Sequence, residues 1–162
     1  MQIEQARIDD ADAVASVLQE AAQWLSNTGR PLWIPSEVNH ERVLRDIEAG
    51  VFFAARNGDD VIGAMRFELE DLLFWPEIEA GTSAFVHKLA VRRSWAGNGV
   101  STALLTFARD RARGLECRHL RLDCVADRQA LRAIYERFGF VLHSYVQKGA
   151  RSFARYELAV TD

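Results

Sequence analysis

The chain has 162 residues, 49% of them hydrophobic, which is enough to bury the core of one globular domain. Its 20 Lys and Arg residues stand against 23 Asp and Glu residues, so a net charge of -3 argues against a nucleic acid or an anionic membrane as partner. No segment has the apolar length of a membrane span, and the first residues lack the pattern of a secretory signal. We therefore expect one domain over residues 1–162 and a cytoplasmic location.

Strand and helix patterns alternate along the first half of the sequence. Residues 3–8 predict a strand, Asp9 and Asp10 an N-cap, and apolar residues at helical spacing continue the helix until Gly29. A second helix is predicted over residues 39–49. The strands predicted at residues 51–56 and 61–69 flank Asn57-Gly58, which favours a tight antiparallel hairpin. Residues 71–81 show no sustained period and are predicted to form a loop with substrate contacts.

The second half continues the alternation. It predicts strands at residues 83–91, 119–124, 140–147 and 152–160, a helix ending near Gly114, and another helix stopped by Gly139. The resulting order is β-α-α-β-β-β-α-β-α-β-β, in which one strand-helix-strand crossover is expected to be parallel and the other pairings antiparallel. An α/β fold with a mixed sheet follows.

The most informative segment is a strand, a turn with Gly97 and Gly99, and an amphipathic helix, over residues 87–105. Glycines remove Cβ atoms where a ligand approaches the backbone, and the start of the helix offers N–H groups and a positive dipole end to a pyrophosphate. Taken alone the signal is weak, because ordinary strand-to-helix turns also use glycine. The segment has neither the Gly-Lys-[Ser/Thr] of a Walker A loop nor the third glycine of a Rossmann turn. A diphosphate-bearing ligand of another protein family remains.

This segment resembles motif A of the GNAT superfamily of N-acetyltransferases, a Leu-Ala-Val strand followed by [Arg/Gln]-x-x-Gly-x-[Gly/Ala] and a helix. Residues 120–124 and 130–140 resemble motif B, so the resemblance covers nearly the whole chain. Two positions depart from the pattern, since Ala96 stands at the Arg/Gln position and Ser101 at the last Gly/Ala position. Arg92 and Arg93 either supply the missing charge to CoA or are solvated surface residues, and the sequence leaves both readings open.

The resemblance implies a GNAT-like mixed, mostly antiparallel sheet of six to seven strands flanked by about four helices, with strands four and five splayed to form an acyl-CoA cleft. It implies an acetyl-CoA-dependent N-acetyltransferase that acts directly on a primary amine of a small molecule or peptide. A catalytically silent acyl-CoA-binding or sensing module on the same fold is the alternative. Homodimers are common in the superfamily, so a homodimer stays open. The predicted acetyl-CoA-binding residues are Leu89, Ala90, Val91, Ala96, Gly97, Asn98, Gly99, Val100, Ser101 and Thr102.

Two residues are predicted to be catalytic. Tyr135 matches the GNAT tyrosine that protonates the CoA thiolate, and a phenol with a pKa of about 10 suits a general acid, although the residue also fits an apolar helix face. His87 stands two residues before Leu89, so strand alternation puts both on one face, and some members carry a catalytic histidine there. An imidazole titrates near neutral pH and is a suitable base, but a structural histidine remains the open alternative. Glu68 and Glu70 are rival bases.

The acceptor side is predicted from aromatic residues in irregular segments. Trp33 and Trp75 lie beside prolines and, with Glu68, are the predicted substrate-binding residues, because aromatic faces near Glu77 and Glu79 suit a cationic amine. Trp24 is expected to pack. No metal is expected, since Cys117 and Cys124 lack CxxC spacing and a histidine cluster, and both are predicted to be inert and partly buried.

Overall fold

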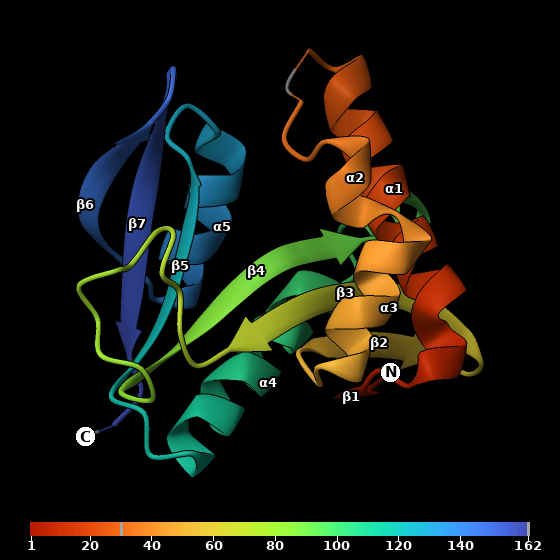
Figure 1. The fold of residues 1–162 in the computed structure, drawn as a ribbon, viewed down its shortest axis with the longest axis horizontal. Coiled ribbons are helices and arrows are strands. Elements are labelled where there is room, and N and C mark those ends of the chain that lie inside the picture. Colours follow the sequence, from red (N-terminus) through yellow and green to blue (C-terminus); the bar gives the residue numbers. More distant parts are fainter. Residues whose placement is uncertain (30, 162) are drawn as a thin grey trace. The chain divides into compact units, whose positions relative to one another are not determined.

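The computed structural model describes residues 1–29 and 31–161. Hydrogen bonds order seven strands as β1-β2-β3-β4-β5-β7-β6, with β4 and β5 parallel, which confirms the predicted mixed α/β fold. Figure 1 traces these elements along the chain. The chain divides into two compact units, Met1–Phe67 with Lys88–Leu105 and Glu68–His87 with Thr106–Asp162. Each unit is described by itself, and a single domain over residues 1–162 stays a prediction.

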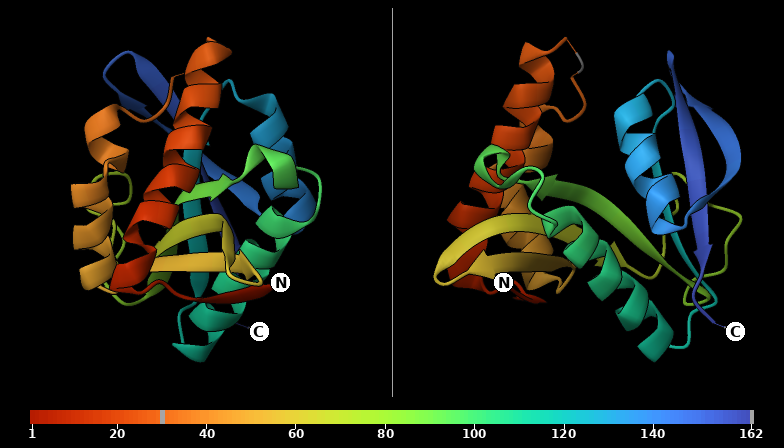
Figure 2. Two further views of the ribbon diagram at one scale, coloured as in Figure 1. Left: turned by 90° about the vertical axis from the view of Figure 1, so that its right-hand side faces the viewer. Right: turned by 180° about the vertical axis from the view of Figure 1, so that it is seen from behind.

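The first unit is a small antiparallel sheet covered by helices. Its strands are β1 (Gln2–Gln5), β2 (Phe52–Asn57) and β3 (Asp60–Glu68), and its helices are α1 (Ala11–Asn27), the short α2 (Pro35–Val38) and α3 (His40–Glu48). Helices α1 and α3 lie along the same face of β2 and β3 (Figures 1 and 2). The buried core between them is formed by apolar side chains spaced for helices or strands, including Val14, Leu18, Val43, Ile47, Phe52 and Ala64.

Local signals explain where these elements begin and turn. The side chain of Asn39 caps α3 by accepting a 2.8 Å hydrogen bond from the N–H of Arg42. Asn57 pairs with Asp60, so the hairpin turn consists of Gly58 and Asp59, and Gly58 adopts a left-handed φ of 63°. The predicted hairpin is therefore confirmed.

Two predictions for the start of the chain were wrong in detail. The first strand ends at Gln5 rather than at residue 8, because Ile8–Asp10 forms a 3-10 turn before α1. Asp10 precedes α1 as expected, but its carboxylate does not cap that helix. It accepts from the N–H of Arg7 at 2.7 Å and pairs with the buried guanidinium of Arg56. The contact with Arg56 comes from a distant strand and cannot be read from local sequence.

The second unit is built on the parallel pair. It holds the first part of β4 (Ser83–Val91), β5 (His119–Val125), α5 (Gln129–Phe138) and the hairpin of β6 (Val141–Lys148) with β7 (Arg151–Ala159). β4 and β5 pair over Ser83–Phe85 and His119–Arg121, whereas β5 and β7 pair along the whole of β5. No register pair joins β4 to β5 beyond Phe85 among the described residues, as the expected splay of these strands requires.

Helix α4 (Val100–Gly114) follows β4 and contributes its first residues to the first unit and the rest to the second. In the first unit it packs tightly on β3, since a Cβ added to Gly63 would lie 2.9 Å from Val100 and 3.3 Å from Leu104. Throughout the described part of the chain, no helix combines the length and the apolar character needed to cross a membrane.

Candidate active site

The turn between β4 and α4 presents exposed backbone. Gly97 and Gly99 adopt left-handed φ values of 79° and 80°, and residues 96–99 are exposed. The first helical hydrogen bond of α4 runs from the N–H of Ala103 to the carbonyl of Gly99 at 3.0 Å, so the three preceding N–H groups of the helix lie ahead of the bonded ladder. Those groups, of Val100, Ser101 and Thr102, are the donors that the sequence predicted for a pyrophosphate, beside the positive end of the helix dipole.

The structure gives a conformational reason for the two glycines. A Cβ at Gly97 or Gly99 would meet no described protein atom within 4 Å, so packing of the protein does not require them, and close approach of a ligand stays a prediction. Their positive φ, which L-residues rarely adopt, is sufficient to select glycine. The space in front of the turn is left open for a ligand.

The two arginines near the turn are engaged within the first unit. Arg92 donates to the carbonyl of Val61 at 3.2 Å and to Ser16 at 3.1 Å, and it pairs with Glu20 at 3.4 Å. The guanidinium of Arg93 lies 4.0 Å from the centre of the Trp24 ring. Trp24 is therefore a stacking partner on the surface rather than a core residue. Neither arginine is a free replacement for the charge missing at Ala96.

Strand β4 is irregular next to His87. Lys88 has a φ of 52°, an uncommon conformation for a residue other than glycine. Strand alternation does not run regularly through such a residue, so the shared face of His87 and Leu89 stays a prediction. Beyond Lys88, Leu89 and Val91 are half-buried and Ala90 is buried.

Lys88 also contacts Trp33, a predicted acceptor-binding residue. The Lys88 ammonium lies 5.1 Å from the centre of the Trp33 ring and 3.1 Å from the carboxylate of Glu37. Burial lowers the pKa of Lys88. The charge of Glu37 and its hydrogen bond with Lys88 act to raise this pKa, but the effect of burial is larger. Trp33 thus packs on the core of the first unit and already holds a cation of the chain itself, which corrects its prediction as a site for a cationic amine.

His87 lies between two carboxylates in the second unit. Its Nε2 is 3.1 Å from Oδ2 of Asp71, in the loop after β3, and its Nδ1 is 3.9 Å from Oδ2 of Asp123 on β5. Both aspartate side chains are at least nine-tenths buried, with exposed fractions of 6% and 9%, whereas 21% of the His87 side chain is exposed. The imidazole is therefore partly accessible while its anionic neighbours are withdrawn from water.

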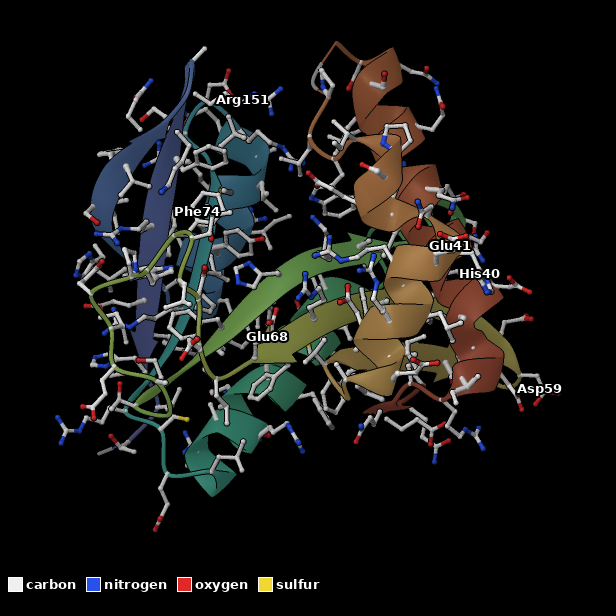
Figure 3. All side chains as sticks on the ribbon, viewed as in Figure 1. His40, Glu41, Asp59, Glu68, Phe74 and Arg151 are labelled. Carbon is white, nitrogen blue, oxygen red and sulfur yellow. The ribbon has the colours of Figure 1, made fainter. Side chains whose placement is uncertain are left out.

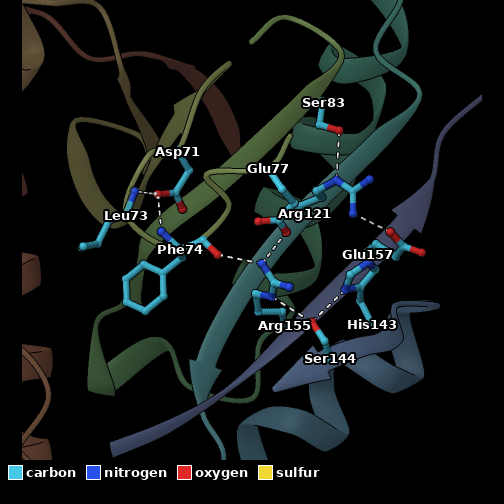
Figure 4. A network of polar contacts seen from close by, with 10 residues as sticks. All are labelled: Asp71, Leu73, Phe74, Glu77, Ser83, Arg121, His143, Ser144, Arg155 and Glu157. Carbon is cyan, nitrogen blue, oxygen red and sulfur yellow. Dashed lines mark hydrogen bonds and ion pairs between the residues drawn. The ribbon is translucent and has the colours of Figure 1, made fainter. Parts of the chain in front are cut away.

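Asp71 is held in place by its own loop, as Figure 4 shows. Its Oδ1 accepts hydrogen bonds from the N–H of Leu73 at 3.0 Å and of Phe74 at 2.9 Å. Burial acts to raise the pKa of Asp71, but the contacts with His87 and the two backbone donors outweigh it, and the pKa is lowered. Asp71 is an anion at neutral pH with one oxygen fixed and the other facing His87.

The ligand atoms of Asp71, His87 and Asp123 lie within 4.8 Å of one another, a grouping that a metal ion could join. The nearest contacts are Oδ2 of Asp71 with Nε2 and Oδ2 of Asp123 with Nδ1. The group is therefore a candidate for a metal ion as well as for a histidine that moves a proton.

Tyr135 is buried in the same unit, with 5% of its surface exposed. Its ring contacts those of Phe140 and Tyr156, with centroids 5.9 and 6.2 Å apart. Burial, followed by the charges of Cys124 and Asp123, raises its pKa, although Arg128 acts the other way. The phenol therefore stays protonated at neutral pH, as the role of an acid requires.

The two cysteines are buried and reduced. Burial raises the pKa of Cys124 to about 11 and that of Cys117 above its usual range. A thiol that remains protonated at neutral pH is a poor nucleophile, which agrees with the prediction that both are inert, and both are buried rather than partly buried.

Trp75 was predicted to line an acceptor pocket, and this was wrong. Its side chain is fully buried in the second unit, where the guanidinium groups of Arg155 and Arg121 lie 4.4 and 4.8 Å from its ring centre. Arg155 also binds Glu77 and the carbonyl of Phe74 (Figure 4). The neighbouring proline did not expose the indole, because the loop folds back over the arginine pair. Glu77 is thereby engaged in an ion pair with Arg155.

Glu68 is half-buried at the end of β3, where Figure 3 labels it, and Glu70 is exposed beyond the strand. Asp71 and Asp123 are functional candidates that the sequence analysis missed. Asp123 stands in a strand that alternates polar and apolar residues, after His119 and Arg121, so the sequence gives little signal that it contacts His87. Asp71 opens a loop, and its contact with His87 depends on tertiary structure.

Comparison with known proteins gives consistent matches. A family model described as "Acetyltransferase (GNAT) family" matches residues 18–140. A relative from Bacillus subtilis (strain 168), named "Uncharacterized N-acetyltransferase YesJ", is 28% identical over 161 residues, covering 94% of this chain and 87% of its own length.

Solved structures share the fold at lower identity. The PaiA N-acetyltransferase from Thermoplasma acidophilum, in complex with coenzyme A, has a TM-score of 0.77 at 17% identity, over 97% of this chain and 98% of its own. YncA from Salmonella typhimurium, with its cofactor acetyl-CoA, has a TM-score of 0.77 at 17% identity, over 100% of this chain and 95% of its own.

Proposed function

Since this chain belongs to the GNAT acetyltransferase family, we propose that it transfers an acetyl group directly from acetyl-CoA to a primary amine of a small molecule or peptide. The observation that carries the proposal is the exposed turn at Gly97 and Gly99, followed by the unbonded N–H groups at the start of α4. These donors suit the pyrophosphate of CoA. The solved structures of PaiA with coenzyme A and YncA with acetyl-CoA support the choice of this ligand.

In the proposed reaction the amine nitrogen attacks the thioester carbonyl carbon, a C–N bond forms, and the C–S bond breaks with its electron pair going to sulfur. His87 takes the first proton of the incoming ammonium and later passes it to water. As the intermediate collapses, Tyr135 gives its proton to the departing thiolate, and the second proton of the nitrogen passes through water to the phenolate, which restores Tyr135. The products are the amide and CoA with a free thiol. A backbone N–H near Leu89 or Val91 polarises the carbonyl, as the family resemblance implies.

Direct transfer is supported by the state of the cysteines. An acyl-enzyme would need a thiolate, and the pKa of Cys124 is raised to about 11. Tyr135 is protonated at neutral pH and so has a proton to give, although its raised pKa makes it a weaker acid than a free phenol. Glu68 remains the second candidate for the base and for contact with the acceptor.

The test is thiol release from acetyl-CoA across a panel of polyamines, amino acids, aminoglycosides and peptide N-termini, with thermal denaturation measured in parallel. We expect acetyl-CoA at 100 times its Kd to stabilise the protein by about 2.7 kcal/mol and at least one amine to release thiol. Stabilisation without thiol release from any amine would favour the silent acyl-CoA-binding module. Absence of both effects would remove the acyl-CoA site.

A further inference from the structure

The contacts of His87 indicate which of its two ring nitrogens carries the proton in the neutral ring. The buried Oδ2 of Asp71 has no donor aligned for a regular hydrogen bond within residues 1–29 and 31–161. Its close neighbour is Nε2 of His87 at 3.1 Å. An ionised carboxylate only accepts hydrogen bonds, so this contact is favourable only when Nε2 carries the proton. Catalytic hydrogen bonds are often poorly aligned before substrate binds.

If Nε2 carries the proton of the neutral ring, the lone pair is on Nδ1. The nearest charged partner of Nδ1 is Oδ2 of Asp123 at 3.9 Å. This distance is too long for a direct hydrogen bond, so the contact that the structure shows between Asp123 and Nδ1 is one of charge. A proton arriving at Nδ1 turns the ring into a cation beside two buried carboxylates.

We propose that Asp71 is a positioning residue that holds His87 in the Nε2–H tautomer, so that Nδ1 accepts the proton of the acceptor amine while Asp123 stabilises the resulting imidazolium. The inference rests on the proposed function for the reaction, but the tautomer itself is a property of the protein alone. The groups around the ring are Asp71 from the loop and Asp123 from β5, and the charge of Asp123 also acts on Tyr135 of α5.

An alternative reading gives the pair a purely structural task, with His87 fastening the loop after β3. Two features argue against it. Asp71 is already fixed by the N–H groups of Leu73 and Phe74, and the loop is further joined to β7 through Arg155. The loop therefore does not need His87 to hold its shape.

The decisive variant is Asp71→Asn, which has the same shape. Its carbonyl oxygen can still accept from Leu73 and Phe74, and its NH₂ then faces Nε2 of His87. Two donors cannot pair, so the ring must move its proton to Nδ1 and offer Nε2 as acceptor. The base is lost although the fold is kept. We expect kcat to fall by about 10²- to 10⁴-fold, the range for loss of a general base and for a tautomer-reversing change of this type, while KM for acetyl-CoA stays within a few-fold.

The matched control is Asp59→Asn, at the exposed β2–β3 turn that Figure 3 labels, which should keep wild-type kcat. Nitrogen-15 NMR of the histidine rings gives a readout that needs no acceptor. We expect the wild-type His87 to show a protonated Nε2 in its neutral form, and Asp71→Asn to show a protonated Nδ1.

Three results would overturn the inference. They are a protonated Nδ1 in the wild-type protein, wild-type kcat in a folded Asp71→Asn variant, and a stoichiometric change of the His87 signals on adding ZnCl₂, which would make the ring a metal ligand. If Asp71→Asn does not fold, the wild-type spectrum alone decides the tautomer. Failure of every amine in the panel would remove the proposed reaction and leave the tautomer assignment to stand or fall on its own spectrum.

Discussion

At the scale of single residues, the second unit holds both predicted catalytic side chains in contrasting surroundings. Tyr135 is enclosed by aromatic rings, while His87 is partly exposed and faces carboxylates. Burial penalises the phenolate, so Tyr135 keeps its proton at neutral pH.

Replacing Tyr135 by Phe deletes one oxygen and keeps the ring contacts with Phe140 and Tyr156. We expect stability to change little and kcat to fall by about 100-fold or more, because a general acid is lost. kcat and kcat/KM should fall together while acetyl-CoA affinity is kept. Steady-state kinetics on Tyr145→Phe, which removes an exposed hydroxyl, provide the control. Unchanged turnover in Tyr135→Phe, or a loss confined to KM for acetyl-CoA, would take Tyr135 out of the mechanism.

Replacing His87 by Gln keeps a polar side chain but removes the titrating group. We expect turnover to fall by about 100-fold or more and the acidic limb of the kcat profile to disappear between about pH 6 and 9. The control is His40→Gln, since His40 also contacts an aspartate, Asp12 at 2.6 Å, but on the exposed surface of α3. If the His87 variant keeps the wild-type profile, the base is Glu68 or water.

At the scale of elements, the turn into α4 combines a left-handed backbone with the N–H groups that we propose bind the pyrophosphate. The left-handed φ of Gly97 and Gly99 sets the path of the chain, and the same path leaves the first N–H groups of α4 facing outward from the ladder. Every helix leaves its first N–H groups without helical partners, and here the glycine turn places exposed backbone directly before them.

We expect Gly99→Val to weaken acetyl-CoA binding by at least about tenfold, since a β-branched residue at positive φ is strained and its side chain fills the open space before the turn. Gly58→Val is the matched control, because Gly58 also has a positive φ, 63°, and open space around it, but lies in the β2–β3 hairpin. Calorimetric titration of both folded variants compares the sites. Equal affinities in Gly99→Val and in the wild type would refute this placement of the pyrophosphate.

At the scale of the whole molecule, each unit contains a buried carboxylate whose pKa is lowered. In the first unit, burial opposes the shift of Asp10, and the bonds from Arg56 and Arg7 produce it. In the second, Asp71 is shifted by His87 and its loop. Both groups bind protons more weakly in the folded chain than in the unfolded chain, so each contributes stability above the unfolded pKa of about 3.9.

The free energy of unfolding should therefore fall as the pH drops below about 4. In this range the carboxylates bind protons in the unfolded chain but are still ionised in the folded chain. Urea denaturation at pH 7, 4 and 3 measures this fall. Asp10→Asn should cost about 1–3 kcal/mol at pH 7, because Arg56 is left with less charge compensation, and should flatten the dependence on pH. If the free energy of unfolding of Asp10→Asn depends on pH as steeply as that of the wild type, Asp10 does not contribute to the pH dependence.

The sequence by itself determined the elements whose signals are local. Glycines, prolines, the cap expected at Asp9 and Asp10, and apolar spacing located the helices and strands, because these features act through neighbouring residues. The Gly97–Gly99 turn and the helix after it were recognisable for the same reason, and they identified the family.

Only the tertiary structure decided where distant side chains meet. It buried Trp75 between two arginines, set Lys88 over Trp33, and brought Asp71 and Asp123 to the two nitrogens of His87. Asp71 and His87 are 16 positions apart and Asp123 lies 36 positions further along the chain. Contacts of this kind depend on how strands pair and how a loop folds back over them, and no local preference encodes them.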